Sequence, residues 1–266
     1  MTPAHLLDQL RFPLRTAGFV GLTFGMYGLL EVDTARSPAS AHHDVLHAWM
    51  RRYGRALLAL YGVEVRAGGP HVGSGGHYPG TDARGRGRLF VMNHRSGLDV
   101  PITLSFFEAT ILSRADLARW PVIGVAARRV GVLFVDRSDR RSGAAVVQAM
   151  TAALERGRGV MVYPEGTTFA GDEVRPFRPG AFTAAARAGA EIVPVGLAYG
   201  GAEAAYVDES FADHMKRVSR ARRTPAAIEL GEPIAAAGGD VDALRDAAHQ
   251  AVQALVHRAR AALGSP

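Results

Sequence analysis

A histidine and an aspartate five positions apart, His94 and Asp99, are the side chains of this sequence best suited to chemistry. A histidine that removes a proton from an alcohol needs a partner that holds its tautomer and stabilises its charge, and a nearby carboxylate does both. The apolar run at 89–92 predicts a buried strand, and residues 93–97 predict the turn that leaves it. Open α/β sheets place their sites at such strand ends. A surface ion pair or a helix cap is the alternative.

Three further apolar runs lead into polar segments. Residues 131–135 run into an arginine-rich stretch, residues 159–163 into Pro-Glu-Gly-Thr-Thr, and residues 192–199 contain Val-Pro-Val. Together with the first segment they resemble the glycerolipid acyltransferase family, whose best-known members are the 1-acylglycerol-3-phosphate acyltransferases. That family carries Asn-His-x4-Asp, Phe-x-x-Arg, Pro-Glu-Gly-Thr and Val-Pro-Val blocks in this order. All four are present here, in order, over roughly residues 87 to 199.

The resemblance implies direct acyl transfer from a thioester to a hydroxyl. His94 would take the proton of the acceptor hydroxyl, and Asp99 would orient the ring without itself accepting the proton. No enzyme nucleophile is needed, and the absence of cysteine excludes a thiol acyl-enzyme. Ser96 is interpreted as a turn residue that caps the next helix. The implied co-substrate is acyl-CoA or acyl-carrier protein, and neither a cofactor nor a metal is expected.

The same resemblance implies residues that bind the acceptor. Arg137 matches the family arginine that binds phosphate, which suits the two-pronged guanidinium; the alternative for it, and for Arg140 and Arg141, is a solvated helix start. Arg114 stands where a lysine is common in the family, so acceptor identity is less secure than reaction type. The predicted substrate-binding residues are Asn93, Arg114, Arg137, Glu165, Gly166 and Thr167.

The Pro-Glu-Gly-Thr segment fits a tight turn after a strand. Gly166 would let the backbone approach a ligand, while exposed amides and the Thr167 hydroxyl could bind phosphate or an oxyanion. Glu165 either receives a hydrogen bond that fixes the loop or contacts the acceptor. Many relatives have arginine or serine at the position of Thr168, and Arg175 or Arg178 could replace that cation. Pro194 lies inside a strand-like run, which indicates a bulge or an edge.

Composition agrees with one sizeable α/β domain and an N-terminal addition. The chain has 266 residues, 48% of them hydrophobic, with a net charge of +6 and a pI near 10.1. This balance suits an anionic membrane surface or a phosphorylated acceptor. Nucleic acid is not expected as a partner, because the sequence has no recognition-helix pattern, zinc spacing or basic stretch interleaved with aromatics.

The N-terminal segment is predicted to associate with a membrane. Residues 16–30 are uncharged but would span only about 22 Å as a helix, less than the roughly 30 Å hydrocarbon core. A cleaved signal peptide is one alternative. Residues 42–60 predict an arginine-lined amphipathic helix of the interfacial kind, for which simple packing on the catalytic domain is the alternative. The expected location is the cytoplasmic face of the cell membrane.

Strands and helices alternate beyond this segment. Strands are predicted at 89–92, 110–113, 131–135, 159–163, 192–199 and 227–230, and helices at 99–107, 121–129, 143–156, 179–188 and from a cap at Asp240 onward. Glycine-rich residues 66–88 are interpreted as a loop or weak hairpin. The predicted fold is an α/β mixed sheet flanked by helices, like that of glycerophosphate acyltransferases, with membrane-associating helices at 1–65 and a catalytic domain at 66–266.

Two function classes fit these observations. The first is an O-acyltransferase that converts 1-acylglycerol-3-phosphate to phosphatidic acid, with another lyso-lipid such as lyso-ornithine lipid as the nearest alternative acceptor. The second is a catalytically silent, membrane-bound lipid-binding protein. Because His94 and Asp99 are both placed on a turn, alanine at either position is expected to abolish transfer and leave the fold intact. Alanine at Arg137 should mainly raise the KM for a phosphorylated acceptor.

Overall fold

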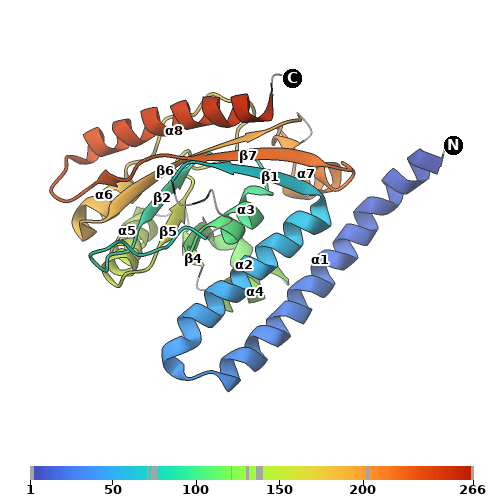
Figure 1. Ribbon diagram of the computed structural model, residues 1–266, viewed down its shortest axis with the longest axis horizontal. Coiled ribbons are helices and arrows are strands. Elements are labelled where there is room, and N and C mark those ends of the chain that lie inside the picture. Colours follow the sequence, from blue (N-terminus) through green and yellow to red (C-terminus); the bar gives the residue numbers. More distant parts are fainter. Residues whose placement is uncertain are drawn as a thin grey trace.

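A mixed sheet forms the centre of the protein. The computed structural model describes residues 3–70, 72, 77–120, 122–129, 132–135, 140–201 and 204–264. Eight strands lie in the order β1-β7-β6-β2-β5-β3-β4, with β8 paired to β6 (Figure 1). Their bounds are β1 (Val63–Gly68), β2 (Leu89–Met92), β3 (Thr110–Arg114), β4 (Leu133–Val135), β5 (Val160–Val162), β6 (Glu191–Tyr199), β7 (Thr224–Leu230) and β8 (Ile234–Ala235). Only β7 and β8 pair antiparallel with β6, so the prediction of a mixed sheet is confirmed.

Helices cover both faces of the sheet. α8 and α6 lie over one face, and α2 and α3 over the other, with α1 running beside α2 (Figure 1). The helices are α1 (Pro3–Arg36), α2 (His42–Tyr61), α3 (Asp99–Phe106), α4 (Ile123–Arg129), α5 (Arg140–Glu155), α6 (Gly180–Ala188), α7 (Phe211–Val218) and α8 (Val241–Leu263), with short 3-10 helices at Ala39–Ala41 and Ala115–Arg119. The predicted cap of α8 is confirmed, because the Asp240 side chain accepts the Ala243 amide at 2.9 Å.

β2 is apolar throughout because both of its faces are buried. Phe90 and Met92 point into the core shared with α2 and α3, whereas Leu89 and Val91 point into the core shared with α5, α6 and α8. All four are fully buried. Successive strand residues face opposite sides, so a central parallel strand needs an unbroken hydrophobic run. The strand that delivers His94 is therefore held from both sides.

Pro194 lies in an interior strand and not at an edge. Its strand, β6, pairs with β2 on one side; on the other, β8 pairs at Glu191 and Ile192, and β7 from Val195 onward. Pro194 falls between these two partners, where a missing amide costs little, and its carbonyl accepts the Gly231 amide at 3.0 Å. Of the two predicted alternatives, a bulge or an edge, the edge is wrong, because β6 has partner strands on both sides.

α2 and α3 approach each other closely at Gly54. A Cβ atom there would lie 2.8 Å from the carbonyl oxygen of Pro101 and 2.7 Å from the Oγ of Ser105. Any side chain would push the two helices apart. Because α3 begins at Asp99, this contact helps to position the candidate site.

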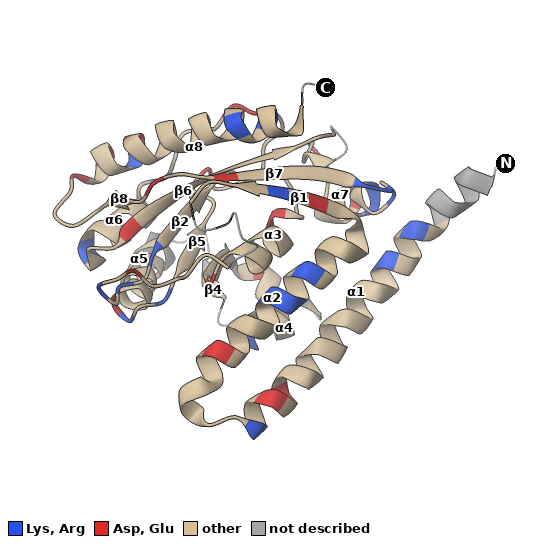
Figure 2. Ribbon diagram, viewed as in Figure 1, with Lys and Arg blue, Asp and Glu red and all other residues tan. Residues whose placement is uncertain are grey.

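The helices α1 and α2 form what we call the N-terminal hairpin, and its first helix is longer than predicted. α1 extends over 34 residues, and its charged residues lie toward its two ends (Figure 2). No helix in the described part of the chain combines the length and the hydrophobicity needed to cross a membrane. Large apolar side chains nevertheless point outward from α1, at Leu10, Leu14, Val20, Phe24, Leu29 and Val32, and we call these six residues the α1 apolar stripe.

Among the described strands and α-helices, β1, α7 and β8 were not predicted. β1 begins inside the proposed N-terminal segment and pairs with β7 along its whole length, so the proposed domain boundary after residue 65 falls within a strand of the sheet. Residues 66–88 contain the end of β1 and an antiparallel bridge between Thr81 and Gly87, which bears out the weak-hairpin alternative at 81–87.

Candidate active site

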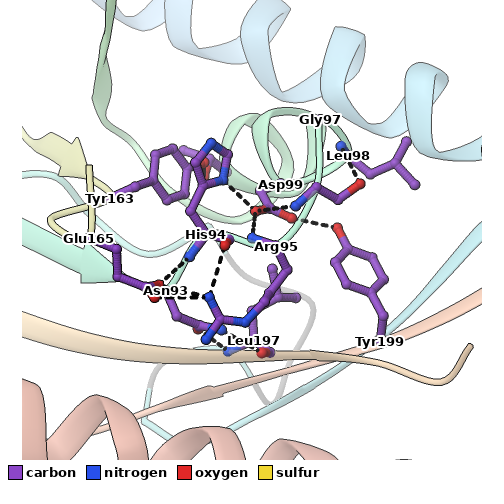
Figure 3. A network of polar contacts seen from close by, with 12 residues as sticks. Asn93, His94, Arg95, Gly97, Leu98, Asp99, Tyr163, Glu165, Leu197 and Tyr199 are labelled. Atoms are coloured by element: carbon purple, nitrogen blue, oxygen red, sulfur yellow. Dashed lines mark hydrogen bonds and ion pairs between the residues drawn. The ribbon is translucent and has the colours of Figure 1, made fainter. Parts of the chain in front are cut away.

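His94 and Asp99 form a direct pair at the carboxyl end of β2. The Nδ1 atom of His94 lies 2.6 Å from the Oδ2 atom of Asp99 (Figure 3). The backbone amides of Arg95 and Ser96 donate to the same oxygen, at 2.7 and 3.0 Å. A carboxylate surrounded by donors is an acceptor, so the proton of the ring lies on Nδ1 and Nε2 keeps its lone pair. None of the described residues hydrogen-bonds to Nε2, which leaves this atom able to accept a proton.

Asp99 is more deeply embedded than the sequence suggested. It is the first residue of α3 and is fully buried. Its Oδ1 atom accepts the Tyr199 hydroxyl at 2.7 Å (Figure 3). Removing the carboxylate would leave these donors without a partner in the interior, which is costly. The expectation that alanine at Asp99 leaves the fold unaffected is therefore wrong, whereas His94, with a side chain 22% exposed, fits that expectation.

Two tyrosines fix the pair. The Tyr163 ring stacks on the His94 ring with 4.3 Å between centroids and 17° between planes, and its hydroxyl lies 2.9 Å from Thr103 Oγ1. Burial, together with the charge of Asp99, raises the pKa of both Tyr163 and Tyr199. Both phenols therefore stay protonated. Tyr199 is the last residue of β6, so its hydrogen bond ties the Asp99 carboxylate to a central strand of the sheet.

Glu165 makes a buried ion pair with Arg95. The Arg95 Nη1 atom lies 2.8 Å from Oε1 and 3.1 Å from Oε2, and the two side chains are 3% and 0% exposed. Oε1 also accepts the His94 amide at 2.9 Å, and Oε2 accepts the Arg175 amide at 3.0 Å. This favours the loop-fixing alternative for Glu165, because all of these contacts are made inside the protein. Arg95 was not singled out from the sequence.

Asn93 is engaged with the backbone of β6. Its Nδ2 atom donates to the Leu197 carbonyl at 2.9 Å, and its Oδ1 atom accepts the Leu197 amide at 2.8 Å (Figure 3). The side chain is fully buried and both of its polar ends are used. These contacts account for Asn93 as a positioning residue, and its predicted contact with substrate stays a prediction.

The Arg178 guanidinium lies beside the turn at Gly166. Gly166 has a φ of +83°, and a Cβ atom on it would lie 2.5 Å from Nε of Arg178. The Gly166 amide donates to Tyr163 at 3.0 Å, so this amide serves the turn. Thr167 and Arg178 are exposed. The arginine suggested as a replacement for a cation at Thr168 therefore lies beside the turn.

A second histidine supports the turn that carries His94. Ser96 Oγ lies 2.9 Å from the Nε2 atom of His214 on α7, and the Gly97 amide donates to the same nitrogen at 3.2 Å. A backbone amide can only donate, so Nε2 is the unprotonated nitrogen and Nδ1 faces Glu209 at 3.1 Å. Burial lowers the pKa of His214. The hydrogen bond from Arg217 holds the pKa of Glu209 at about 2.

The side chains of two predicted substrate-binding residues lie outside the described part of the structure. Arg137 lies outside the described residues. Arg114 ends β3, but its side chain is likewise outside the described part. The backbone of Arg140 and Arg141 begins α5. The structure thus brings together His94, Asp99, Asn93, Glu165 and Gly166, and leaves the arginine contacts as predictions.

Comparisons with known proteins show the family of this chain. A family model described as Acyltransferase matches residues 78–198. The chain is 30% identical over 255 residues to a lyso-ornithine lipid O-acyltransferase from Pseudomonas aeruginosa, covering 93% of this chain and 94% of that protein. The chain belongs to the acyltransferase family. The resemblance inferred from the four sequence blocks is thereby confirmed, and the protein is an acyltransferase.

Two other acyltransferases are similar over different extents. A 1-acyl-sn-glycerol-3-phosphate acyltransferase from Neisseria meningitidis is 28% identical over 146 residues, covering 55% of this chain and 53% of that protein. The crystal structure of the 1-acyl-sn-glycerophosphate acyltransferase PlsC from Thermotoga maritima has a TM-score of 0.72 at 18% identity, covering 95% of both chains. This structural likeness supports the acyltransferase fold, including the N-terminal hairpin.

Proposed function

We propose that this acyltransferase moves a fatty acyl chain from acyl-CoA or acyl-carrier protein to the free hydroxyl of a lyso-lipid. The observation that carries the proposal is the 2.6 Å contact between His94 Nδ1 and a buried Asp99 carboxylate, which directs the lone pair of Nε2 outward. Nε2 takes the proton of the acceptor hydroxyl as its oxygen attacks the thioester carbonyl carbon. Collapse of the tetrahedral intermediate breaks the carbon–sulfur bond, and His94 returns the proton to the departing thiolate.

The proposed acceptor rests on how much of this chain aligns with each named relative. The P. aeruginosa relative, named a lyso-ornithine lipid O-acyltransferase, aligns over 93% of this chain, whereas the N. meningitidis relative, named for 1-acylglycerol-3-phosphate, aligns over 55%. This difference favours lyso-ornithine lipid as the first candidate. 1-Acylglycerol-3-phosphate is the second candidate, supported by the arginine of the Phe-x-x-Arg block.

An anionic group on the acceptor fits both candidates, because ornithine carries a carboxylate and the glycerol compound a phosphate. Arg178 lies exposed beside Gly166, on the loop that also carries Glu165. A guanidinium can donate two hydrogen bonds to either anion. We therefore assign Arg178, together with Arg137, to the acceptor side of the site.

Membrane association is the second part of the proposal. The residues of the α1 apolar stripe are exposed. Their helix carries no charge between Arg15 and Glu31 (Figure 2). An outward apolar face on a long helix is the arrangement of helices that lie in the membrane interface. The proposed location is the cytoplasmic side of the cell membrane, where lyso-lipid and acyl donor meet.

The test is a transfer assay with parallel acceptors. Detergent-solubilised protein receives a radiolabelled long-chain acyl-CoA or acyl-carrier protein with lyso-ornithine lipid or 1-acylglycerol-3-phosphate. We expect label in ornithine lipid, lost in His94→Ala and kept in His257→Ala, a matched change of an exposed histidine on α8. Label in phosphatidate alone would transfer the proposal to the second acceptor. Vesicle binding without transfer to either acceptor would support the lipid-binding alternative.

A further inference from the structure

A group of side chains of metal-ligating type lies away from the catalytic pair. His43 and His47 are on α2, and Glu108 follows the C-terminal end of α3. One ligand atom from each of the three lies within 4.8 Å of the others. The two imidazole rings have centroids 4.4 Å apart with planes at 49°. Since α3 begins at Asp99, this group and the catalytic pair lie at opposite ends of the same helix.

The spacing suits a metal better than hydrogen bonds between the side chains. His43 and His47 are four residues apart and thus project from one helix face. The Nδ1 atom of His43 lies 3.7 Å from Oε1 of Glu108, which is too long for a hydrogen bond. Zinc–nitrogen bonds of about 2.1 Å in a tetrahedral site separate neighbouring ligand atoms by about 3.4 Å. A small side-chain adjustment would close the difference.

The ligand atoms are available and partly fixed. Glu108 accepts the Gly80 amide on Oε2 at 3.3 Å, which holds the carboxylate while Oε1 faces His43. The Nδ1 atom of His47 is buried and has no hydrogen-bond partner among the described residues.

Charge and access are also compatible with a cation. The charges that act on His47 are Asp44, which favours a positive charge there, and His43 and Arg158, which oppose it. Glu108 adds a further carboxylate. The His43 side chain is 42% exposed and provides an entry path. Two imidazoles and one carboxylate select a borderline transition metal over magnesium or calcium, which prefer all-oxygen sites.

We propose that His43, His47 and Glu108 bind one divalent metal ion of the zinc class. The ion would join α2 to the segment after α3 and would stabilise the attachment of the N-terminal hairpin to the sheet. It is separate from the chemistry at His94.

The test is direct metal binding by the full-length, tag-free protein after treatment with a chelator. Titration calorimetry with zinc chloride near pH 7.5 is expected to give one ion per chain, a rise in Tm, and no competition from excess magnesium or calcium. Cobalt(II) is expected to give the visible absorption of a low-coordinate site. His47→Gln and Glu108→Gln should weaken zinc binding by at least about 10-fold.

Two controls separate this site from general histidine binding. His42→Gln changes a neighbour on the same helix, whose ring contacts the Ser37 carbonyl at 3.1 Å, and should bind zinc as the unaltered protein does. His94→Ala should also bind normally, because its histidine belongs to the catalytic pair. The proposal is overturned if no zinc binds at micromolar concentration, or if His47→Gln and Glu108→Gln retain full affinity.

Discussion

Replacing Glu165 with alanine tests whether this residue fixes the loop or contacts the acceptor. The substitution leaves the Arg95 guanidinium, 3% exposed, without its carboxylate. It also removes the acceptor for the backbone amides of His94 and Arg175. Breaking a buried ion pair by removing one partner costs about 3–5 kcal/mol, and the lost amide contacts overlap with that figure instead of adding to it.

We therefore expect the free energy of unfolding of Glu165→Ala to fall by about 3–5 kcal/mol. With a urea dependence of about 3 kcal/mol per molar, the unfolding midpoint should move down by about 1–2 M. Glu165→Gln keeps an accepting oxygen for only one of the two amides, because its Nε2 atom is a donor, but it fills the same space and should lose less than alanine. Turnover should fall as well, because the His94 amide loses the partner that holds the catalytic turn.

The matched control is Glu173→Ala in the same loop. The Glu173 side chain is 77% exposed and lies 3.8 Å from Arg175, so its removal should change stability by less than about 1 kcal/mol. If Glu165→Ala were as stable as this control and only raised the KM for the lyso-lipid, Glu165 would be an acceptor ligand and the loop-fixing argument would be wrong.

Three further perturbations test other parts of the site. Asp99→Asn should lower kcat by about 10³–10⁴-fold, since it disturbs the tautomer of the base, and near-normal turnover at saturating acyl donor would contradict the assignment. Burial lowers the pKa of His214, so this residue binds fewer protons in the folded protein than in the unfolded chain. The free energy of unfolding should therefore fall as pH drops below about 6.5. Urea titrations at several pH values should show a flatter pH dependence for His214→Gln. The double substitution Leu14→Glu and Phe24→Glu should abolish co-sedimentation with anionic vesicles. The control Val207→Glu, at a position as exposed as Phe24 (both 49%), should not. Equal vesicle binding by the unaltered protein and both variants would contradict a membrane role for the α1 apolar stripe.

Elements buried on both faces could be predicted from sequence, whereas elements defined by distant partners could not. β2 and β6 are continuous apolar runs, and the predicted bounds of β2 match the observed ones. β1 was missed although Glu64 and Arg66 alternate with apolar residues as in a half-buried strand; it is short, and its pairing with β7 joins residues more than 150 positions apart. α7 was missed although Phe211, Met215 and Val218 follow a helical spacing, because the helix is only 8 residues long.

The residues of the candidate site fall into the same two groups. Some pair within one short segment, and others pair across long sequence separations. His94 and Asp99 lie on one short segment, so their spacing alone indicated a pair. Arg95 lies in that segment too, but its role depends on Glu165, 70 positions later. Tyr199 and His214 are 100 and 118 positions from their partners in the turn. No local signal distinguishes a tyrosine that ends a strand as support for a catalytic carboxylate.

The way Asn93 is held has a consequence for the chemical ageing of this enzyme. Asparagine deamidates when the following backbone nitrogen attacks the side-chain carbonyl carbon. Here that nitrogen belongs to His94 and donates to Glu165, while the Asn93 amide is bound at both ends by Leu197. The folded chain therefore blocks the reaction at this position. A chain that opens locally and deamidates there would place a carboxylate against the Leu197 carbonyl, so each such opening risks permanent loss of the catalytic turn.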